Sequence, residues 1–219
     1  MARIVFDLDG TLIDSAPDIH AGANALLMAE GSEPITLAEA RGFVGQGAAA
    51  FIEKVRHARG IAESEQARLL AAFVQSYATL ITRTRVYPGV LEALERLRDD
   101  GHRLGICTNK PLVPCNAVLA HLGLERLFEV VLAGDSLPTH KPDPAPLHAA
   151  FAALGEGPQI FVGDGEVDAE TARRAKVPFL LYTEGYRKAE VASLPHAAAF
   201  SDHGALVGLV EKFGVETAG

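Results

Sequence analysis

The chain of 219 residues has only two cysteines, Cys107 and Cys115. They belong to no Cys-x-x-Cys pair and to no Cys/His pattern with the spacing of zinc ligands, so neither a disulfide framework nor a structural zinc site is expected. A sequence without such a framework is typical of a reducing compartment, and we expect a cytoplasmic protein.

Long hydrophobic runs are also missing. The first apolar run, residues 4–6, is interrupted at once by Asp7 and Asp9. It is far shorter than the roughly 18 residues that a membrane helix needs, and it does not have the form of a signal peptide. We therefore expect no association with a membrane.

The chain has fewer basic residues than acidic ones. The 20 Lys and Arg residues face 28 Asp and Glu residues, which gives a net charge of -8. Such a chain has no broad attraction for nucleic acid, although a few converging donors in a cleft can still bind a small anion. The apolar fraction of 48% and the charged fraction of 22% are those of a soluble globular protein.

Several functional motifs are absent as well. The sequence contains no Gly-x-x-x-x-Gly-Lys, no Gly-x-Ser-x-Gly and no His-Glu-x-x-His. Residues 45–50 match Gly-x-Gly-x-x-Ala, but they follow a helical stretch rather than a strand. Residues 163–165 do follow a strand, yet Asp168 stands where a dinucleotide site needs its third glycine. Dinucleotide binding is therefore not expected.

The chain does contain short apolar runs that alternate with helical periodicity. These runs carry no alternating polar residues, which is typical of parallel strands covered on both faces. The alternation predicts an α/β fold with a doubly wound, Rossmann-like parallel sheet. The five predicted strands are residues 4–6, 104–107, 130–132, 160–162 and 179–181.

The alternation stops between the first two runs, where residues 14–84 contain no convincing strand. Thr36 and Glu39 form a capping box, and apolar residues recur at helical spacing on both sides of it. We predict an all-helical subdomain over 14–84, inserted into a core made of 1–13 and 85–219. Its apolar stripes are expected to form the subdomain's own hydrophobic core.

The strongest local pattern is Asp-Leu-Asp-Gly-Thr at residues 7–11, directly after the first predicted strand. Ligands bind outside the carboxyl ends of the strands in open parallel sheets, which is where Asp7 and Asp9 are expected. Buried carboxylates need a cation or a shared proton, and their oxygens suit Mg²⁺. The alternative interpretation is a polar turn.

Three further strand ends carry matching chemistry. Thr108 and Asn109 offer a hydroxyl and an amide, or else begin a helix. Lys141 offers an ammonium group for a phosphoryl oxygen. Asp164 and Asp168 lie one helical turn apart, where acidic residues also favour a helix N-terminus. Because all four strand ends should meet at one sheet edge, we predict a single site.

These four pieces resemble the haloacid dehalogenase superfamily of aspartate-nucleophile phosphatases over nearly the whole chain. The resemblance implies that residues 14–84 form a small helical cap and that Asp7 is the nucleophile. It further implies that Asp9 is the general acid and base, and that Thr108, Asn109 and Lys141 bind the phosphoryl oxygens. Mg²⁺ would be bound by Asp7, by the Asp9 carbonyl and by Asp164. Asp168 would lie behind these ligands without binding the ion directly. The expected partner is a small anionic phosphate ester.

Within the superfamily, residues 14–18, 134–138 and 141–144 are most similar to phosphoglycolate phosphatases, which implies 2-phosphoglycolate as the substrate. Two positions depart from that pattern, Gly165 in place of serine and Lys176 in place of glycine. We expect Lys176 to adopt a left-handed conformation after a helix, at a cost of about 1 kcal/mol.

Alternatives to this function remain open. A phosphomutase, or a phosphatase for another small sugar or organic phosphate, could share every core residue. A phosphorylated receiver domain uses similar groups but has only about 120 residues. Candidates for contacting the non-phosphate end of the substrate are Arg41, Gly45, Gln46, Gly47 and Lys54, although a solvated helix face and a flexible connector are equally compatible with them.

Overall fold

A parallel sheet forms the centre of the computed structural model, which describes residues 1–77 and 79–216. Its strands lie in the order β5-β4-β1-β6-β7-β8, and every neighbouring pair is parallel. All five predicted strands are present. The strands are β1 (Arg3–Phe6), β4 (Arg103–Cys107), β5 (Val130–Leu132), β6 (Gln159–Gly163), β7 (Phe179–Tyr182) and β8 (Ala198–Phe200).

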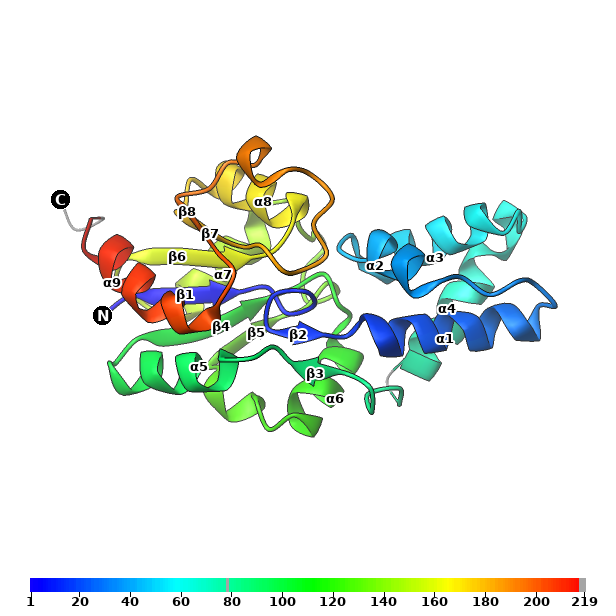
Figure 1. The fold of residues 1–219 in the computed structure, drawn as a ribbon, viewed down its shortest axis with the longest axis horizontal. Coiled ribbons are helices and arrows are strands. Elements are labelled where there is room, and N and C mark those ends of the chain that lie inside the picture. The colour runs from blue at the N-terminus through cyan, green and yellow to red at the C-terminus, as the bar shows by residue number, and fades with distance from the viewer. Residues whose placement is uncertain (78, 217–219) are drawn as a thin grey trace.

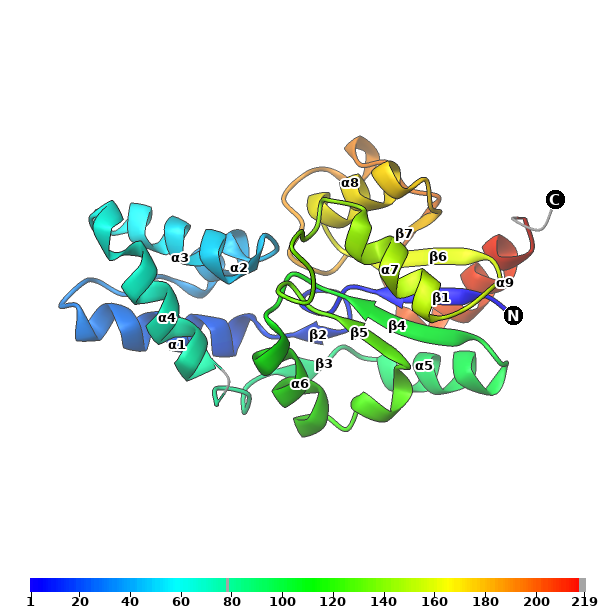
Figure 2. The same cartoon turned by 180° about the vertical axis from the view of Figure 1, so that it is seen from behind.

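Helices cover both faces of the sheet, as the doubly wound fold requires (Figures 1 and 2). One face packs on α5 (Val90–Asp99), α6 (Leu112–His121) and α9 (Leu206–Glu216). The other packs on α7 (Ala145–Ala153) and α8 (Glu166–Ala175). Short 3-10 turns cover Glu63–Glu65, Glu125–Leu127, Val191–Ser193 and His203–Ala205.

Strand β1 lies between β4 and β6, in the middle of the sheet. Ile4 and Phe6 are fully buried in the hydrophobic core of one face, and Val5 is fully buried in the core of the other. Burial on both sides explains why every residue of the strand after Arg3 is apolar. Edge strand β5 is only half-buried, so its apolar sequence does not reflect full coverage.

Four helices form the cap, which projects from the carboxyl end of the sheet (Figure 1). They are α1 (Ala16–Ala29), α2 (Leu37–Phe43), α3 (Gly47–Ala58) and α4 (Gln66–Tyr77). The capping box is confirmed, because the Thr36 hydroxyl accepts from the Glu39 amide and the Glu39 carboxylate accepts from the Thr36 amide. The predicted stripes meet in a separate hydrophobic core that includes Ile19, Phe73 and Tyr77.

Two short strands join the cap to the core, and the sequence did not predict them. Strand β2 (Ile13–Asp14) pairs antiparallel with β3 (Arg85–Val86), so the outgoing and returning connectors lie side by side. Two residues are too few to show strand periodicity. The division into 1–13, 14–84 and 85–219 stays a prediction, and the last three residues lie outside the described part of the chain.

The remaining local expectations concern single residues and the membrane. Lys176 ends α8 with φ 56° and ψ 42°, as expected for the left-handed position. Cys107 and Cys115 are buried and free, and burial raises the pKa of each thiol to about 12. Across the described residues, no helix combines the length and apolar character needed to cross a bilayer.

Candidate active site

The carboxyl end of the sheet brings the predicted residues together. Asp7 follows β1, Thr108 and Asn109 follow β4, and Asp164 follows β6. These three strands are neighbours, with β1 in the middle. After β1 the chain adds β4 and β5 on one side and then crosses to add β6, β7 and β8 on the other side. Open α/β sheets bind their ligands at such a topological switch point.

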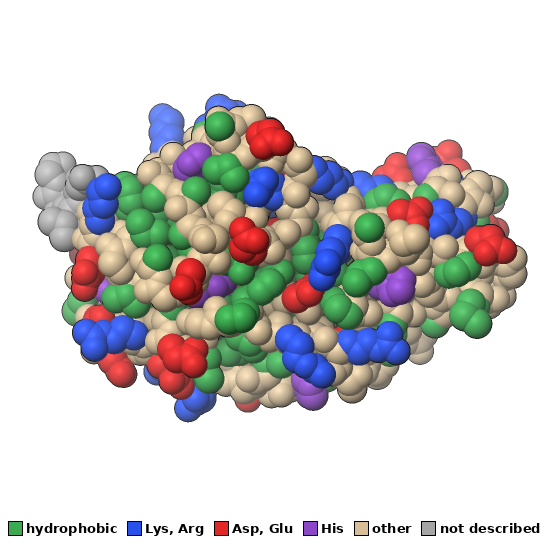
Figure 3. Space-filling view, in the orientation of Figure 1, with side chains coloured by type: hydrophobic (Ala, Val, Ile, Leu, Met, Phe, Trp, Pro, Cys, Tyr) green, Lys and Arg blue, Asp and Glu red, His purple; other side chains and the backbone are tan. Residues whose placement is uncertain are grey.

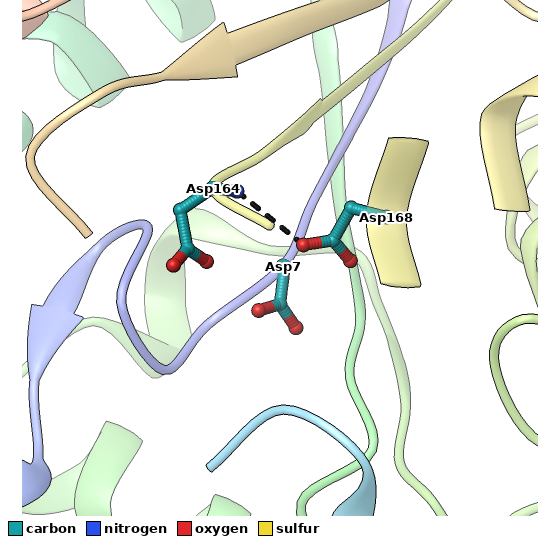
Figure 4. A group of neighbouring side chains, drawn as sticks. All are labelled: Asp7, Asp164 and Asp168. Carbon is teal, nitrogen blue, oxygen red and sulfur yellow. Dashed lines mark hydrogen bonds between the residues drawn. The ribbon is translucent and has the colours of Figure 1, made fainter. Parts of the chain in front are cut away.

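Three carboxylates form the centre of the site. Oxygen atoms of Asp7, Asp164 and Asp168 all lie within 4.8 Å of one another. Figure 4 shows that they converge on one space from two loops and from helix α8. The main-chain amides of Asp164 and Gly165 donate to Asp168 Oδ2, each at 3.3 Å, which fixes the orientation of this carboxylate.

Lys141 reaches the same cluster from the loop after β5. Its Nζ lies 2.7 Å from Asp7 Oδ1 and 2.6 Å from Asp168 Oδ1, and the lysine is buried. Burial alone lowers the pKa of a lysine, but here Asp168 and Asp7 outweigh it and raise the pKa well above the usual range. Lys141 is therefore a fixed positive charge beside the Asp7 carboxylate.

One ammonium cannot neutralise three buried carboxylates. Burial raises the pKa of Asp7 to about 6, although Lys141 opposes this shift. Burial, with the charges of Asp168 and Asp7, raises the pKa of Asp164 well above its usual range. When all three are ionised, two negative charges are left without a partner. Oxygen ligands with this excess charge fit a hard divalent cation, so the cluster has the composition of a metal site.

Asp164 is held by contacts that the sequence did not predict. Thr11 Oγ1 donates to its Oδ1 at 3.0 Å, and the Tyr186 amide donates to its Oδ2 at 2.6 Å. Gly10 and Gly185 pack directly on this carboxylate, where a Cβ at either position would overlap it. The tight packing explains why glycine follows Asp9 in the first motif. Tyr186 contributes through its backbone, which no side-chain pattern reveals.

Asn109 orders the loop that carries Lys141. Its Oδ1 accepts from the Lys141 amide at 3.0 Å, and its Nδ2 donates to the Lys141 carbonyl at 2.9 Å. The same Nδ2 donates to the Gly45 carbonyl of the cap at 3.1 Å. Helix α6 begins at Leu112, beyond Asn109, so the alternative of a helix cap is wrong for this residue.

Asp9 lies on the cap side of Asp7, beside a lysine that sequence reasoning missed. Lys110 Nζ is 3.1 Å from Asp9 Oδ1, and Ser15 Oγ donates to the same oxygen at 2.5 Å. The Lys110 side chain is only 2% exposed and also contacts the Tyr77 hydroxyl of α4. The one signal in the sequence is its place directly after Thr108 and Asn109.

Two cavities meet at Asp7 and Asp9. The smaller, which we call the inner cavity, has a volume of about 50 Å³ and is lined on the cap side largely by apolar residues. The larger, which we call the outer cavity, has a volume of about 320 Å³. The inner lining includes Ile19, Val44, Gly45, Gly47, Phe51, Phe73, Tyr77, Thr108, Asn109 and Lys110. The outer lining includes Gln46, Lys54, Asp164, Glu166, Asp168, Tyr186 and Lys188.

The cap candidates therefore separate into three places. Gly47 lines the inner cavity, Gly45 lines both cavities, and Gln46 and Lys54 line the outer one. Burial lowers the pKa of Lys54, whose Nζ donates to the Phe43 carbonyl at 3.3 Å. Arg41 instead pairs with Asp14 at 2.9 Å, beside the connectors between cap and core. Charges on this face of the molecule are mixed rather than gathered in one patch (Figure 3).

Comparison with known proteins extends these findings. The chain is 50% identical over 215 residues to a phosphoglycolate phosphatase of Cereibacter sphaeroides, a match that covers 97% of this chain and 99% of the relative. It is 39% identical over 213 residues to a phosphoglycolate phosphatase of Rhodospirillum rubrum, covering 93% and 88% of the two chains.

Solved structures and family models agree with these matches. The crystal structure of a predicted phosphoglycolate phosphatase from Haemophilus somnus superposes with a TM-score of 0.88 at 29% identity, covering 95% of this chain and 97% of that one. The model of the haloacid dehalogenase-like hydrolases matches residues 1–176. With its strand-end acidic cluster, its helical cap and these matches, the chain belongs to the haloacid dehalogenase-like hydrolase family.

Proposed function

We propose that this protein is a Mg²⁺-dependent phosphatase that hydrolyses 2-phosphoglycolate through an aspartyl-phosphate on Asp7. The observation that carries the proposal is the buried cluster of Asp7, Asp164 and Asp168 with Lys141. Asp7 lines both cavities, and Asp164 and Asp168 line the outer one. Relatives named phosphoglycolate phosphatase, which match nearly the full chain, support this choice of substrate.

The acidic cluster is the proposed Mg²⁺ site. Asp7, the Asp9 carbonyl and Asp164 would hold the ion, while Asp168 fixes Lys141 beside them. Bound Mg²⁺ supplies the positive charge that lets a carboxylate and a phosphate dianion approach each other. The two unpaired negative charges of the cluster match the charge of this ion.

Asp7 is the proposed nucleophile. One of its carboxylate oxygens attacks phosphorus, and the bond from phosphorus to the alcohol oxygen breaks as the new bond forms. Lys141, already 2.7 Å from Asp7, would stabilise the negative charge on the transferring phosphoryl oxygens. The Thr108 hydroxyl and the Asn109 main-chain amide, which follow β4 at the same sheet edge, would bind the remaining oxygens.

Asp9 is the proposed general acid and base. It gives a proton to the departing alcohol oxygen. The leaving group is then glycolate, with a neutral hydroxyl group and an unchanged carboxylate. Asp9 then takes a proton from the water that attacks the aspartyl-phosphate. Inorganic phosphate leaves, and both carboxylates return to their starting state.

The cap would limit which esters reach Asp7. Apolar side chains of the cap, such as Phe51 and Phe73, line the inner cavity and would keep bulk water from Asp7 once a substrate fills it. Gln46 and Lys54 lie on the outer cavity, where Lys54 would attract the anionic substrate and Gln46 would contact it. The Gly45 and Gly47 backbone would form the wall between entrance and nucleophile. A small organic phosphate fits such an enclosure, whereas a phosphorylated protein does not.

Release of inorganic phosphate from a panel of small phosphate esters tests the proposal. With Mg²⁺ we expect 2-phosphoglycolate to give the highest kcat/KM, and we expect exhaustive chelation to abolish turnover and added Mg²⁺ to restore it. Full activity after chelation contradicts the metal-dependent mechanism. Conversion of a sugar phosphate to its isomer, without phosphate release, instead identifies a mutase.

A further inference from the structure

Lys110 is a buried cation that the proposed chemistry does not use. It lies in the loop after β4, and its side chain is 2% exposed. Among the described residues that line the inner cavity, it is the one lysine or arginine. A buried ammonium group is costly unless it is paired, so its position demands an explanation.

The surroundings of Lys110 leave it able to bind another anion. Its Nζ contacts Asp9 at 3.1 and 3.4 Å, contacts the Tyr77 hydroxyl, and lies 4.0 Å from the centre of the Tyr77 ring. An ammonium group has three N–H donors, of which one can be shared by the two Asp9 oxygens and a second can go to the Tyr77 hydroxyl. The third donor is therefore available to a ligand in the cavity.

Tyr77 offers a second donor at the same wall. Tyr77 belongs to the hydrophobic core of the cap and also lines the inner cavity, and its hydroxyl contacts Lys110. Burial raises the pKa of this phenol well above its usual range, so it keeps its proton. An ammonium and a phenol next to each other can each donate to one oxygen of a carboxylate.

The position of Lys110 relative to Asp9 fits a particular distance within the substrate. In 2-phosphoglycolate the carboxylate carbon is two bonds from the ester oxygen that Asp9 would protonate. A cation in direct contact with Asp9 is therefore within reach of that carboxylate while Asp9 contacts the ester oxygen. Lys54 lines the outer cavity instead.

We propose that Lys110 and Tyr77 together bind the carboxylate of the substrate and so select phosphate esters that carry a carboxylate on the adjacent carbon. This inference rests on the proposed phosphatase function and adds the residues that recognise the leaving group. The remaining inner wall is largely apolar, so a neutral alcohol end gains no charged partner there. A carboxylate one methylene farther from the ester oxygen lies beyond this short reach.

Equilibrium binding separates recognition from turnover. The ligands are 2-phosphoglycolate and its neutral counterpart 2-hydroxyethyl phosphate, measured by calorimetry with Mg²⁺ on protein carrying Asp7→Asn, so that neither ligand is consumed. Lys110→Gln keeps an amide donor toward Asp9 but removes the positive charge. We expect the preference for 2-phosphoglycolate to fall at least about tenfold, because the hydrogen bond that is lost joins two charged groups.

Lys54→Gln is the matched control, because it removes the same charge from the outer cavity. It should weaken both ligands alike and leave their ratio unchanged. Tyr77→Phe is an independent variant in case Lys110→Gln does not fold, and it should lower the ratio by a smaller factor. The same ratio of kcat/KM values, measured in chains with Asp7 intact, should change in parallel.

Equal losses for both ligands in Lys110→Gln would show that Lys110 acts only through Asp9, and would overturn the proposal. Loss of the preference in Lys54→Gln alone would also overturn it. Failure of the phosphatase proposal looks different: the chain with Asp7 intact would release no phosphate, while binding would still report whether Lys110 selects the carboxylate.

Discussion

The two sides of the cavity differ in what they contribute. The core side holds buried charges at the ends of strands, with Asp7, Lys141 and Asp164 fixed by short hydrogen bonds. The cap side presents the apolar side chains of Phe51 and Phe73 and the backbone of Gly45. The contrast teaches that the groups for the chemistry lie on the core side, whereas we assign substrate selection to the junction where Lys110 of the core meets Tyr77 of the cap.

Mutations can test this division of roles. Changes to Asp7, Lys141 or Asp164 should affect every phosphate ester alike, whereas changes where Lys110 meets Tyr77 of the cap should alter the ratio between esters. A variant of Asp7, Lys141 or Asp164 that shifts substrate preference, or a Tyr77 variant that abolishes all turnover, would show that the two roles are not separate.

Removal of the nucleophile has the largest expected effect. Asp7→Asn replaces the attacking oxygen with an amide of nearly the same shape, and should lower kcat by at least about 10⁴-fold on all substrates. Steady-state phosphate release measures this loss, and thermal unfolding checks that the variant is folded. Substantial residual activity would remove Asp7 from this role.

Removal of the core lysine should have the next largest effect. Lys141→Gln takes away the cation beside Asp7 and should lower kcat by about 10²–10³-fold. The loss should be the same for 2-phosphoglycolate and for 2-hydroxyethyl phosphate, in contrast to Lys110→Gln. A loss specific to the carboxylated ester would mean that Lys141, rather than Lys110, reads the substrate.

Metal binding should stabilise the core in a pH-dependent way. The folded pKa of Asp7 is raised to about 6 from an ordinary value of 3.8, so in chelator its contribution to stability is complete below pH 3.8 and is lost as the pH rises through 6. Mg²⁺ binds the ionised carboxylates and should reverse this loss at pH 8.

Calorimetry at two pH values checks this prediction. A hundredfold excess of Mg²⁺ over its Kd adds about 2.7 kcal/mol, or a rise in Tm of roughly 5–10 °C for a chain of this size. The rise should be clearly smaller at pH 5. An equal rise at both pH values would contradict the assignment of Mg²⁺ to the buried cluster.

The smallest effect is expected far from both sides of the cavity. Lys176 has φ 56°, a conformation that glycine adopts at less cost, so Lys176→Gly should stabilise the core by up to about 1 kcal/mol without changing activity. Lys176→Ala keeps the strained backbone and is the matched control. A gain in Tm for alanine equal to that for glycine would contradict the backbone explanation.

The core could be predicted from the sequence because its signals are local and its topology is restrictive. An apolar run followed by Asp7 or Asp164 indicates a strand end, and parallel strands place their ends along one edge. Strand β8 was missed because its three residues, two of them alanine, carry little strand signal.

The contacts between core and cap could not be predicted in the same way. Helical periodicity predicts the apolar stripes of the cap, but not that the hydroxyl of Tyr77 contacts Lys110, which is 33 positions away. Tyr186 acts on Asp164 through a backbone amide, which every residue except proline offers. Such contacts depend on how the cap and the core pack against each other, and local sequence patterns do not predict that packing.

The paired connectors β2 and β3 have a consequence for how this chain can be altered. Neighbouring strands lie about 5 Å apart, so the segment between Asp14 and Arg85 leaves and re-enters the core at almost the same point. An insert whose two ends are close together can be exchanged without stretching its host. The cap should therefore be exchangeable for another helical segment. A chimaera joined at this junction should retain the sheet and its acidic cluster and carry a different cap.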